Sequence, residues 1–126
     1  MRSNLRYLIA GTLLGSTVSL AVAQTQATFR VPQFENAEVK VWKTVIQPGS
    51  PVSMHRHEHG RALIALNGGT GTIVKVNGQK TVHDWESGRA YWLDADPPGN
   101  ELHADVNEGT APIEVIVVEL KNDKHP

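Results

Sequence analysis

The fold class is decided by the stretch TIVKVNGQKTV, residues 72–82. On both sides of Asn77-Gly78, β-branched residues alternate with polar ones, which is the pattern of two half-buried strands. Asn-Gly between such runs favours a two-residue type I′ turn, because both residues accept a positive φ. The stretch therefore predicts an antiparallel β-hairpin.

Similar short runs continue along the chain on both sides of this hairpin. They are bounded by Gly, Pro or Asn residues and cover 38–46, 61–66, 90–93, 103–106 and 113–120. Many short strands with turn residues between them predict an all-β chain, folded as an antiparallel sandwich or barrel. Residues 24–37 are polar and contain Pro32, so we expect them to form an irregular leader into the barrel.

The N-terminus has the order of segments found in export signals. Arg2 and Arg6 precede an apolar run, and Ala21-Val22-Ala23 follows that run. A basic start, an apolar stretch and a small-residue site predict a signal peptide cleaved after Ala23, and so a periplasmic or secreted protein. The alternative is a membrane anchor, but Gly, Ser and Thr residues interrupt the run and make it too weakly apolar for a spanning helix.

Cleavage would leave one domain-sized chain. The predicted organisation is a signal peptide at 1–23, a leader at 24–37, a barrel at 38–120 and a polar tail at 121–126. Removing Arg2 and Arg6 lowers the 12 basic residues to 10 against 13 acidic ones, a net charge of about −3. That balance does not favour nucleic acid as a partner. The sequence shows no second apolar span, so we do not expect stable insertion in a membrane. The chain contains no cysteine, so core, metal or oligomerisation must stabilise it.

A cluster of histidines suggests a metal site. His55, His57 and His59 alternate in the sequence MHRHEH. In an extended segment, side chains at i and i+2 share a face with Cα atoms about 6.6 Å apart, so two imidazoles can converge on one ion. The alternative is a solvated, histidine-rich surface loop.

The surroundings of these histidines resemble the first motif of the cupin superfamily, Gly-x5-His-x-His-x3–4-Glu-x6-Gly. Gly49, His55, His57 and Gly68 all fall in register. The resemblance spans residues 38–120 and implies a single antiparallel cupin barrel, also described as a double-stranded β-helix or jelly roll.

The second cupin motif, Gly-x5-Pro-x-Gly-x2-His-x3-Asn, is matched in part. Gly88 fits its opening, and His103 and Asn107 fit its ending. Asp94 stands where the motif has proline, and the loop at 97–99 is longer. Through this motif the resemblance implies that His103 joins His55 and His57 as a ligand of a divalent transition metal, which could be Fe, Mn, Ni, Zn or Cu.

One departure from the family pattern changes the expected site. The carboxylate ligand of the first motif should fall at residue 61 or 62, and these are Arg61 and Ala62. The expected site therefore has three histidines, and His59, Glu58 or water are candidates for a further position. If Arg61 faces inward, its charge adds to that of the ion, and a small anionic ligand should compensate for it. The alternative is that Arg61 pairs with Glu58 or Glu101 at the rim.

Two classes of function agree with the expected three-histidine site. The first is a metalloenzyme of dioxygenase, isomerase or lyase type, acting on a small anionic or chelating organic substrate, with Arg61 and Tyr91 as candidate substrate-binding residues. The second is a non-catalytic periplasmic module that binds a metal or an anion. The apolar run 113–120 could also support a homodimer.

Overall fold

The computed structural model describes residues 26–99 and 102–123, and every regular element within them is a β-strand. The strands are β1 (Phe29–Glu35), β2 (Val39–Ile46), β3 (Arg61–Asn67), β4 (Gly69–Lys75), β5 (Lys80–Trp85), β6 (Ala90–Leu93), β7 (His103–Asn107) and β8 (Ile113–Leu120). The all-β prediction is confirmed. In the described ranges there is no helix that is long and apolar enough to cross a membrane. The predicted signal peptide at 1–23 lies outside these residues.

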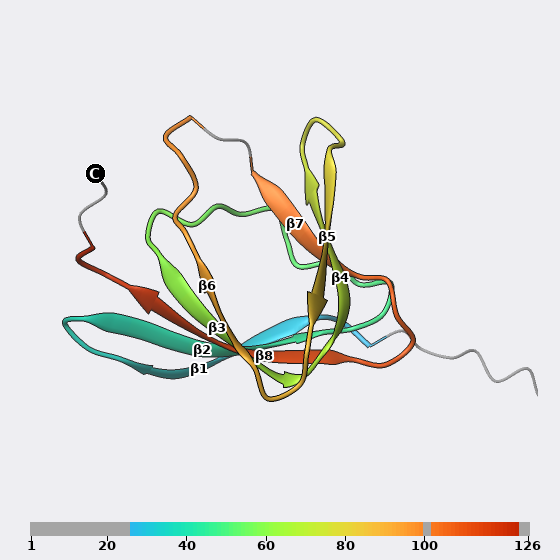
Figure 1. Ribbon diagram of the computed structural model, residues 1–126, viewed down its shortest axis with the longest axis horizontal. Helices are drawn as coiled ribbons and strands as arrows, with labels where there is room; N and C mark the ends of the chain where they lie inside the picture. Colours follow the sequence, from blue (N-terminus) through green and yellow to red (C-terminus); the bar gives the residue numbers. More distant parts are fainter. Residues whose placement is uncertain (1–25, 100–101, 124–126) are drawn as a thin grey trace, which may run out of the picture.

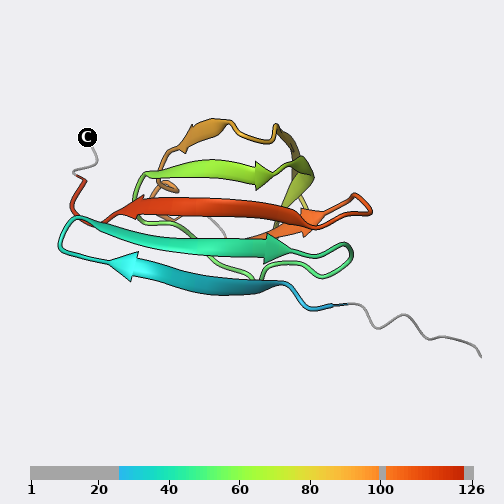
Figure 2. The ribbon, with the colours of Figure 1, turned by 90° about the horizontal axis from the view of Figure 1, so that it is seen from below.

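The strands form two antiparallel sheets. Figure 2 shows five of them side by side in the order β1-β2-β8-β3-β6. The smaller sheet, β5-β4-β7, stands against the larger one at one side of the molecule (Figure 1). The chain passes from one sheet to the other between β3 and β4, which are separated only by Gly68. This is the predicted antiparallel barrel.

Strand β8 forms the centre of the larger sheet. It pairs with β2 on one edge and with β3 on the other, so both edges are already hydrogen-bonded. Its alternate side chains Ile113, Val115 and Val117 are buried in the core, together with Trp42 and Leu63. Burying an aliphatic side chain of this size contributes about 1.5–3 kcal/mol, so β8 supplies much of the core.

The expectation of an irregular leader at 24–37 was wrong, because residues 29–35 form strand β1. This strand pairs with β2 at the edge of the larger sheet, and its register shifts between Pro32 and Phe34. An edge strand tolerates proline, because its outer N–H groups need no partner strand. All seven residues of β1 are exposed, so the strand lacks the buried alternate positions that mark other strands in a sequence.

The hairpin between β4 and β5 lies where it was predicted, but its turn differs. The N–H of Gly78 donates to the carbonyl oxygen of Lys75, and the N–H of Lys75 donates to the carbonyl oxygen of Gln79. These bonds leave a three-residue loop of Val76, Asn77 and Gly78. Only Gly78 has a positive φ, of 86°. A type I′ turn would need a positive φ at Asn77 as well, so this is instead a type I turn closed by a left-handed glycine.

Two residues of the cupin-like motifs have structural roles. A Cβ atom on Gly68 would lie 1.9 Å from the carbonyl oxygen of Trp85, so only glycine fits at this crossing. Asn107 is buried, and its Nδ2 donates to the carbonyl oxygens of Ile46 and Ala111 at 2.9 and 2.8 Å. Asn107 therefore ties β2 to the β7–β8 connection, at the end of the strand that carries His103.

Candidate metal centre

Main-chain hydrogen bonds bring together His55 and His103, which lie far apart in the sequence. The N–H of each residue donates to the carbonyl oxygen of the other, both at 2.9 Å. This isolated antiparallel bridge fixes the loop that carries His55 against strand β7. The two side chains then project to one side, with ring centroids 4.5 Å apart.

Asp96 fixes the position of His57 in a similar reciprocal way. Its carboxylate accepts a 2.7 Å hydrogen bond from the N–H of His57, and its own N–H donates to the carbonyl oxygen of His57 at 2.8 Å. These two bonds hold the loop after β6 against the loop between β2 and β3, which carries His55, His57 and His59 and is called the histidine loop below. The ring of His57 lies parallel to that of Trp42, with 6.5 Å between centroids.

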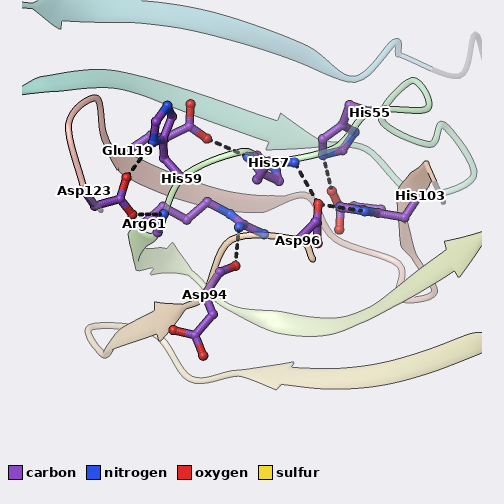
Figure 3. A network of polar contacts seen from close by, with 11 residues as sticks. His55, His57, His59, Arg61, Asp94, Asp96, His103, Glu119 and Asp123 are labelled. Atoms are coloured by element: carbon purple, nitrogen blue, oxygen red, sulfur yellow. Dashed lines mark hydrogen bonds and ion pairs between the residues drawn. The ribbon is translucent and has the colours of Figure 1, made fainter. Parts of the chain in front are cut away.

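His55, His57 and His103 converge on one region, as the sequence predicted (Figure 3). One nitrogen from each ring lies within 4.8 Å of the other two. Ligand atoms about 2.1 Å from a shared ion are at most about 4.2 Å apart, so small side-chain movements would bring all three into coordination. The three residues could therefore hold a metal ion.

Hydrogen bonds on the outer side of two of the rings orient them for this role. Nδ1 of His57 lies 2.7 Å from Oε2 of Glu119, and Nδ1 of His55 lies 2.7 Å from the carbonyl oxygen of Ser53. Nδ1 of His103 lies 3.7 Å from the carboxylate of Asp96. A carboxylate or carbonyl behind a metal-binding histidine fixes the tautomer and raises the basicity of the nitrogen facing the ion.

Burial favours the metal-binding form of two of the histidines. It lowers the pKa of His55, against the opposing effects of the Ser53 carbonyl and Asp105. Burial also lowers the pKa of His103, although the negative charges of Asp105 and Asp96 act in the other direction. Both rings are therefore neutral near pH 7, which is the state that binds a metal.

Two cavities meet at His55 and His57, and His103 lines neither of them. The inner cavity, of about 60 Å³, lies within the barrel and is lined by His55, His57, Arg61, Thr72, Trp85 and Asp105, among others. The outer cavity, of about 410 Å³, is more open and is lined mainly by β1, β2 and the histidine loop. Arg30, Trp42, His55 and His57 line both, so the outer cavity gives a small molecule a path to His55 and His57.

Arg61 is buried, lines the inner cavity and has 7% of its surface exposed. Its NH1 donates to the carbonyl oxygen of Asp94 at 3.1 Å, and in the described residues it forms no ion pair with Glu58. Glu101, the other partner expected at the rim, lies outside these residues. Burial lowers the pKa of the Arg61 guanidinium, an effect opposed by the charges of Asp96 and Glu119.

The charge of the site differs from the expectation. The sequence suggested that an ion and Arg61 would leave their positive charges uncompensated, but the histidines have acidic partners in Glu119, Asp105 and Asp96. Burial acts to raise the pKa of Glu119, but the hydrogen bond from His57 and the nearby positive charges outweigh it and lower the pKa. Glu119 is therefore ionised near pH 7. Three carboxylates would balance the charges of a divalent ion and of Arg61.

Other candidates from the sequence lie outside this centre. His59 is held by the carboxylate of Asp123, a residue of the C-terminal tail, and is not part of the three-histidine group (Figure 3). Glu58 lies 3.5 Å from Arg56 and is largely exposed. The hydroxyl of Tyr91 accepts a hydrogen bond from the N–H of Glu86 and lines neither cavity. The structure thus keeps Arg61 at the site and places Tyr91 away from it.

Sequence reasoning missed several residues of the site. Arg30 lies 5.3 Å above the ring of Trp42 and lines both cavities, but the segment that carries it was read as irregular. Glu119 lies within the apolar run 113–120, where an acidic residue between valines and leucine was the available signal. His83 on β5 stacks on Trp85 and lines the inner cavity.

The sequence matches no family model and no curated protein. Its fold, in contrast, is similar to those of solved structures. A cupin domain from Bordetella pertussis Tohama I matches with a TM-score of 0.67 and 18% identity, over 79% of this chain and 98% of that chain. A cupin superfamily protein from Desulfitobacterium hafniense DCB-2 matches with a TM-score of 0.57 and 16% identity, over 95% and 100% of the two chains.

A third similar structure is the polyketide cyclase RemF from Streptomyces resistomycificus, with a TM-score of 0.54 and 16% identity over 76% of this chain and 66% of that chain. These similarities establish that the chain has the cupin fold, the double-stranded β-helix that its motifs implied. At such low identities the similarity concerns the fold alone, and a shared fold does not determine the function.

Proposed function

We propose that this chain is an exported metalloprotein whose centre of His55, His57 and His103 binds a divalent transition metal and acts on a small organic anion. The observation that carries the proposal is the convergence of the three histidine nitrogens within 4.8 Å. A metal bound there would supply a Lewis acid that polarises an oxygen of the substrate. Dioxygenase, isomerase and lyase chemistry all fit such a site.

A buried, unpartnered nitrogen supports metal binding. Nε2 of His55 is buried and has no hydrogen-bond partner in the described part of the chain. A buried polar atom without a partner costs about 1–3 kcal/mol, so its presence points to a group that binds there. An imidazole nitrogen beside two further histidines is suited to Zn, Cu, Fe or Ni.

Positive and donor groups around the cavities support an anionic substrate. Arg61 lies inside the barrel, and Arg30 lies at the junction of the two cavities. Trp42 also lines both cavities, and its Nε1 is buried with no hydrogen-bond acceptor among the described residues. A divalent ion and the two arginines together would carry four positive charges against the three negative charges of the carboxylates. One substrate carboxylate would neutralise the remaining positive charge.

A non-catalytic binding module is the second candidate. Two of the three carboxylates near the centre are engaged in positioning it, since Glu119 bonds to His57 and Asp96 bonds to the main chain of His57. A general base would have to be free to accept a proton from the substrate. This engagement favours a protein that binds the same anion without turnover.

Metal analysis of the purified protein, followed by oxygen uptake and product analysis with catechols and small carboxylic acids, separates the two functions. Stoichiometric metal with turnover indicates the enzyme, and metal without turnover indicates the binding module. Protein that takes up no divalent metal would refute both. For the anion, Arg61→Met should weaken carboxylate binding without removing the metal, whereas Arg89→Met, a change in an exposed arginine paired with Glu86, should leave binding unchanged.

A further inference from the structure

The side chains of His55 and Asp105 face each other with no hydrogen bond between them. The carbonyl oxygen of Ser53, 2.7 Å from Nδ1 of His55, can only accept, so Nδ1 carries the ring proton and donates it. Nε2 of the neutral ring is then an acceptor. It is buried, and in the described residues it has no hydrogen-bond partner.

The group closest to this nitrogen is another acceptor. Oδ2 of Asp105 lies 3.4 Å from Nε2 of His55, and this is the only polar contact of that carboxylate within the described ranges. A lone pair and a carboxylate at this separation repel each other unless a positive charge lies between them. That charge is either a proton or a metal ion.

We infer that Asp105 is the fourth ligand of the ion held by the three histidines, an inference that rests on the proposed metal function. Two ligands about 2.1 Å from one ion, at a tetrahedral angle, lie about 3.4 Å apart. A proton shared between the groups would instead give a hydrogen bond of about 2.7–3.2 Å along the N–H direction. The observed 3.4 Å contact, which is not a hydrogen bond, fits two ligands of one ion.

The sequence position of Asp105 suits this role. It follows His103 by two residues on β7, so both side chains lie on the same face of the strand. Asp105 is not in the set whose ligand atoms all lie within 4.8 Å of one another, so coordination would require its carboxylate to turn toward His57 and His103. Its negative charge also acts to raise the pKa values of His55, His103 and Arg61, which places it near all three.

Asp105 thereby accounts for the missing glutamate of the first cupin-like motif. In that motif the carboxylate comes from the start of β3, where this chain has Arg61. Here the carboxylate comes from β7, on the other sheet of the barrel. The ion keeps a negatively charged ligand, while the β3 wall of the cavity becomes positive.

The test is metal titration of the full mature protein with Co²⁺ and Zn²⁺, comparing wild type with Asp105→Asn and Asp105→Ala. Loss of a residue behind a metal ligand weakens affinity about 10–100-fold, so loss of a direct ligand should weaken it by at least about 100-fold. The visible absorption of the Co²⁺ form should also change, because the set of ligand atoms changes. The matched control is Asp84→Asn, an exposed aspartate on β5 whose carboxylate accepts from the Thr70 hydroxyl.

The outcomes separate the two claims. Weaker affinity with an altered Co²⁺ spectrum in both Asp105 variants, and an unchanged control, supports coordination by Asp105. Wild-type affinity and spectrum in Asp105→Asn and Asp105→Ala would overturn it and leave Asp105 as an ion-pair partner of His55, with the three-histidine site intact. Failure of the wild type to bind metal would overturn the proposed function as well. Asp105→Asn preserves side-chain shape, so it covers the case in which Asp105→Ala does not fold.

Discussion

The contact between Glu119 and His57 gives a quantitative test of the metal centre. Oε2 of Glu119 lies 2.7 Å from Nδ1 of His57, and the side chains are 20% and 9% exposed. In Glu119→Gln, the amide oxygen can still accept from Nδ1–H, but the bond is no longer charge-assisted. The loss of charge should therefore make the opposite nitrogen of His57 a weaker ligand. We expect metal affinity to fall about 10-fold, at the lower end of the range for such partners.

This change in affinity predicts a change in thermal stability. A metal concentration 100 times the wild-type Kd stabilises the folded protein by about 2.7 kcal/mol, and the same concentration stabilises a variant with 10-fold weaker binding by about 1.4 kcal/mol. For a domain of about 100 residues, the difference of about 1.3 kcal/mol corresponds to roughly 5–10 °C in Tm. The measurement is the metal-induced shift in Tm of each protein, recorded by circular dichroism with and without Zn²⁺.

The control is Glu114→Gln, on the same strand. Glu114 forms a partly exposed ion pair with Lys43 at 3.4 Å and lies five residues before Glu119 on β8. Such pairs contribute only about 0–1 kcal/mol, and this substitution should leave the metal-induced shift unchanged. If Glu119→Gln shows the full wild-type shift in Tm, the contact with Glu119 does not strengthen His57 as a metal ligand. That result would refute the role given to the hydrogen bonds at the Nδ1 atoms of the histidines.

Three further predictions concern the ligands, the fold and export. Alanine at any one of the three clustered histidines should abolish stoichiometric metal binding, whereas His83→Ala should retain the metal, as measured by elemental analysis after dialysis. Gly68→Ala should destabilise the protein by about 2 kcal/mol or more in urea unfolding, because the new Cβ would lie 1.9 Å from a main-chain oxygen. Gly109→Ala, whose Cβ would lie 3.2 Å from a side-chain atom, should cost less; equal losses would contradict the steric argument. Mass spectrometry of the exported protein should find an N-terminus at Gln24, and an intact Met1 would contradict cleavage.

The strands that could be predicted from sequence are those that bury one face. In β3 and β8, buried residues alternate with less buried ones, and turn residues bound each strand. Strand β1 has no buried position and its register shifts between Pro32 and Phe34, and its proline argues against a strand unless the edge position is known. The hairpin turn was placed correctly, but its type depends on the φ of Asn77, which the Asn-Gly pair does not determine.

The histidines of the site could be predicted because their spacing is local or belongs to a motif. Their carboxylate partners could not be predicted, because each of them reaches the site through tertiary contacts. Glu119 comes from the end of β8, and Asp96 comes from the proline-rich loop that follows β6. An i, i+2 spacing on β7 connects Asp105 to His103, but this pattern gained meaning only when the structure placed Asp105 opposite His55.

The position of Arg61 follows from the same distribution of charge. A buried guanidinium is costly unless negative groups surround it, and here the charges of Asp96, Glu119 and Asp105 all act on it. These carboxylates also support the three histidines, so one set of acids stabilises both the arginine and the ion that we propose. A glutamate at residue 61 would add a negative charge to this group and remove the positive side of the cavity. An arginine there instead leaves positive charge on β3 and, through Arg30, on β1, and both charges would attract the anionic substrate that we propose.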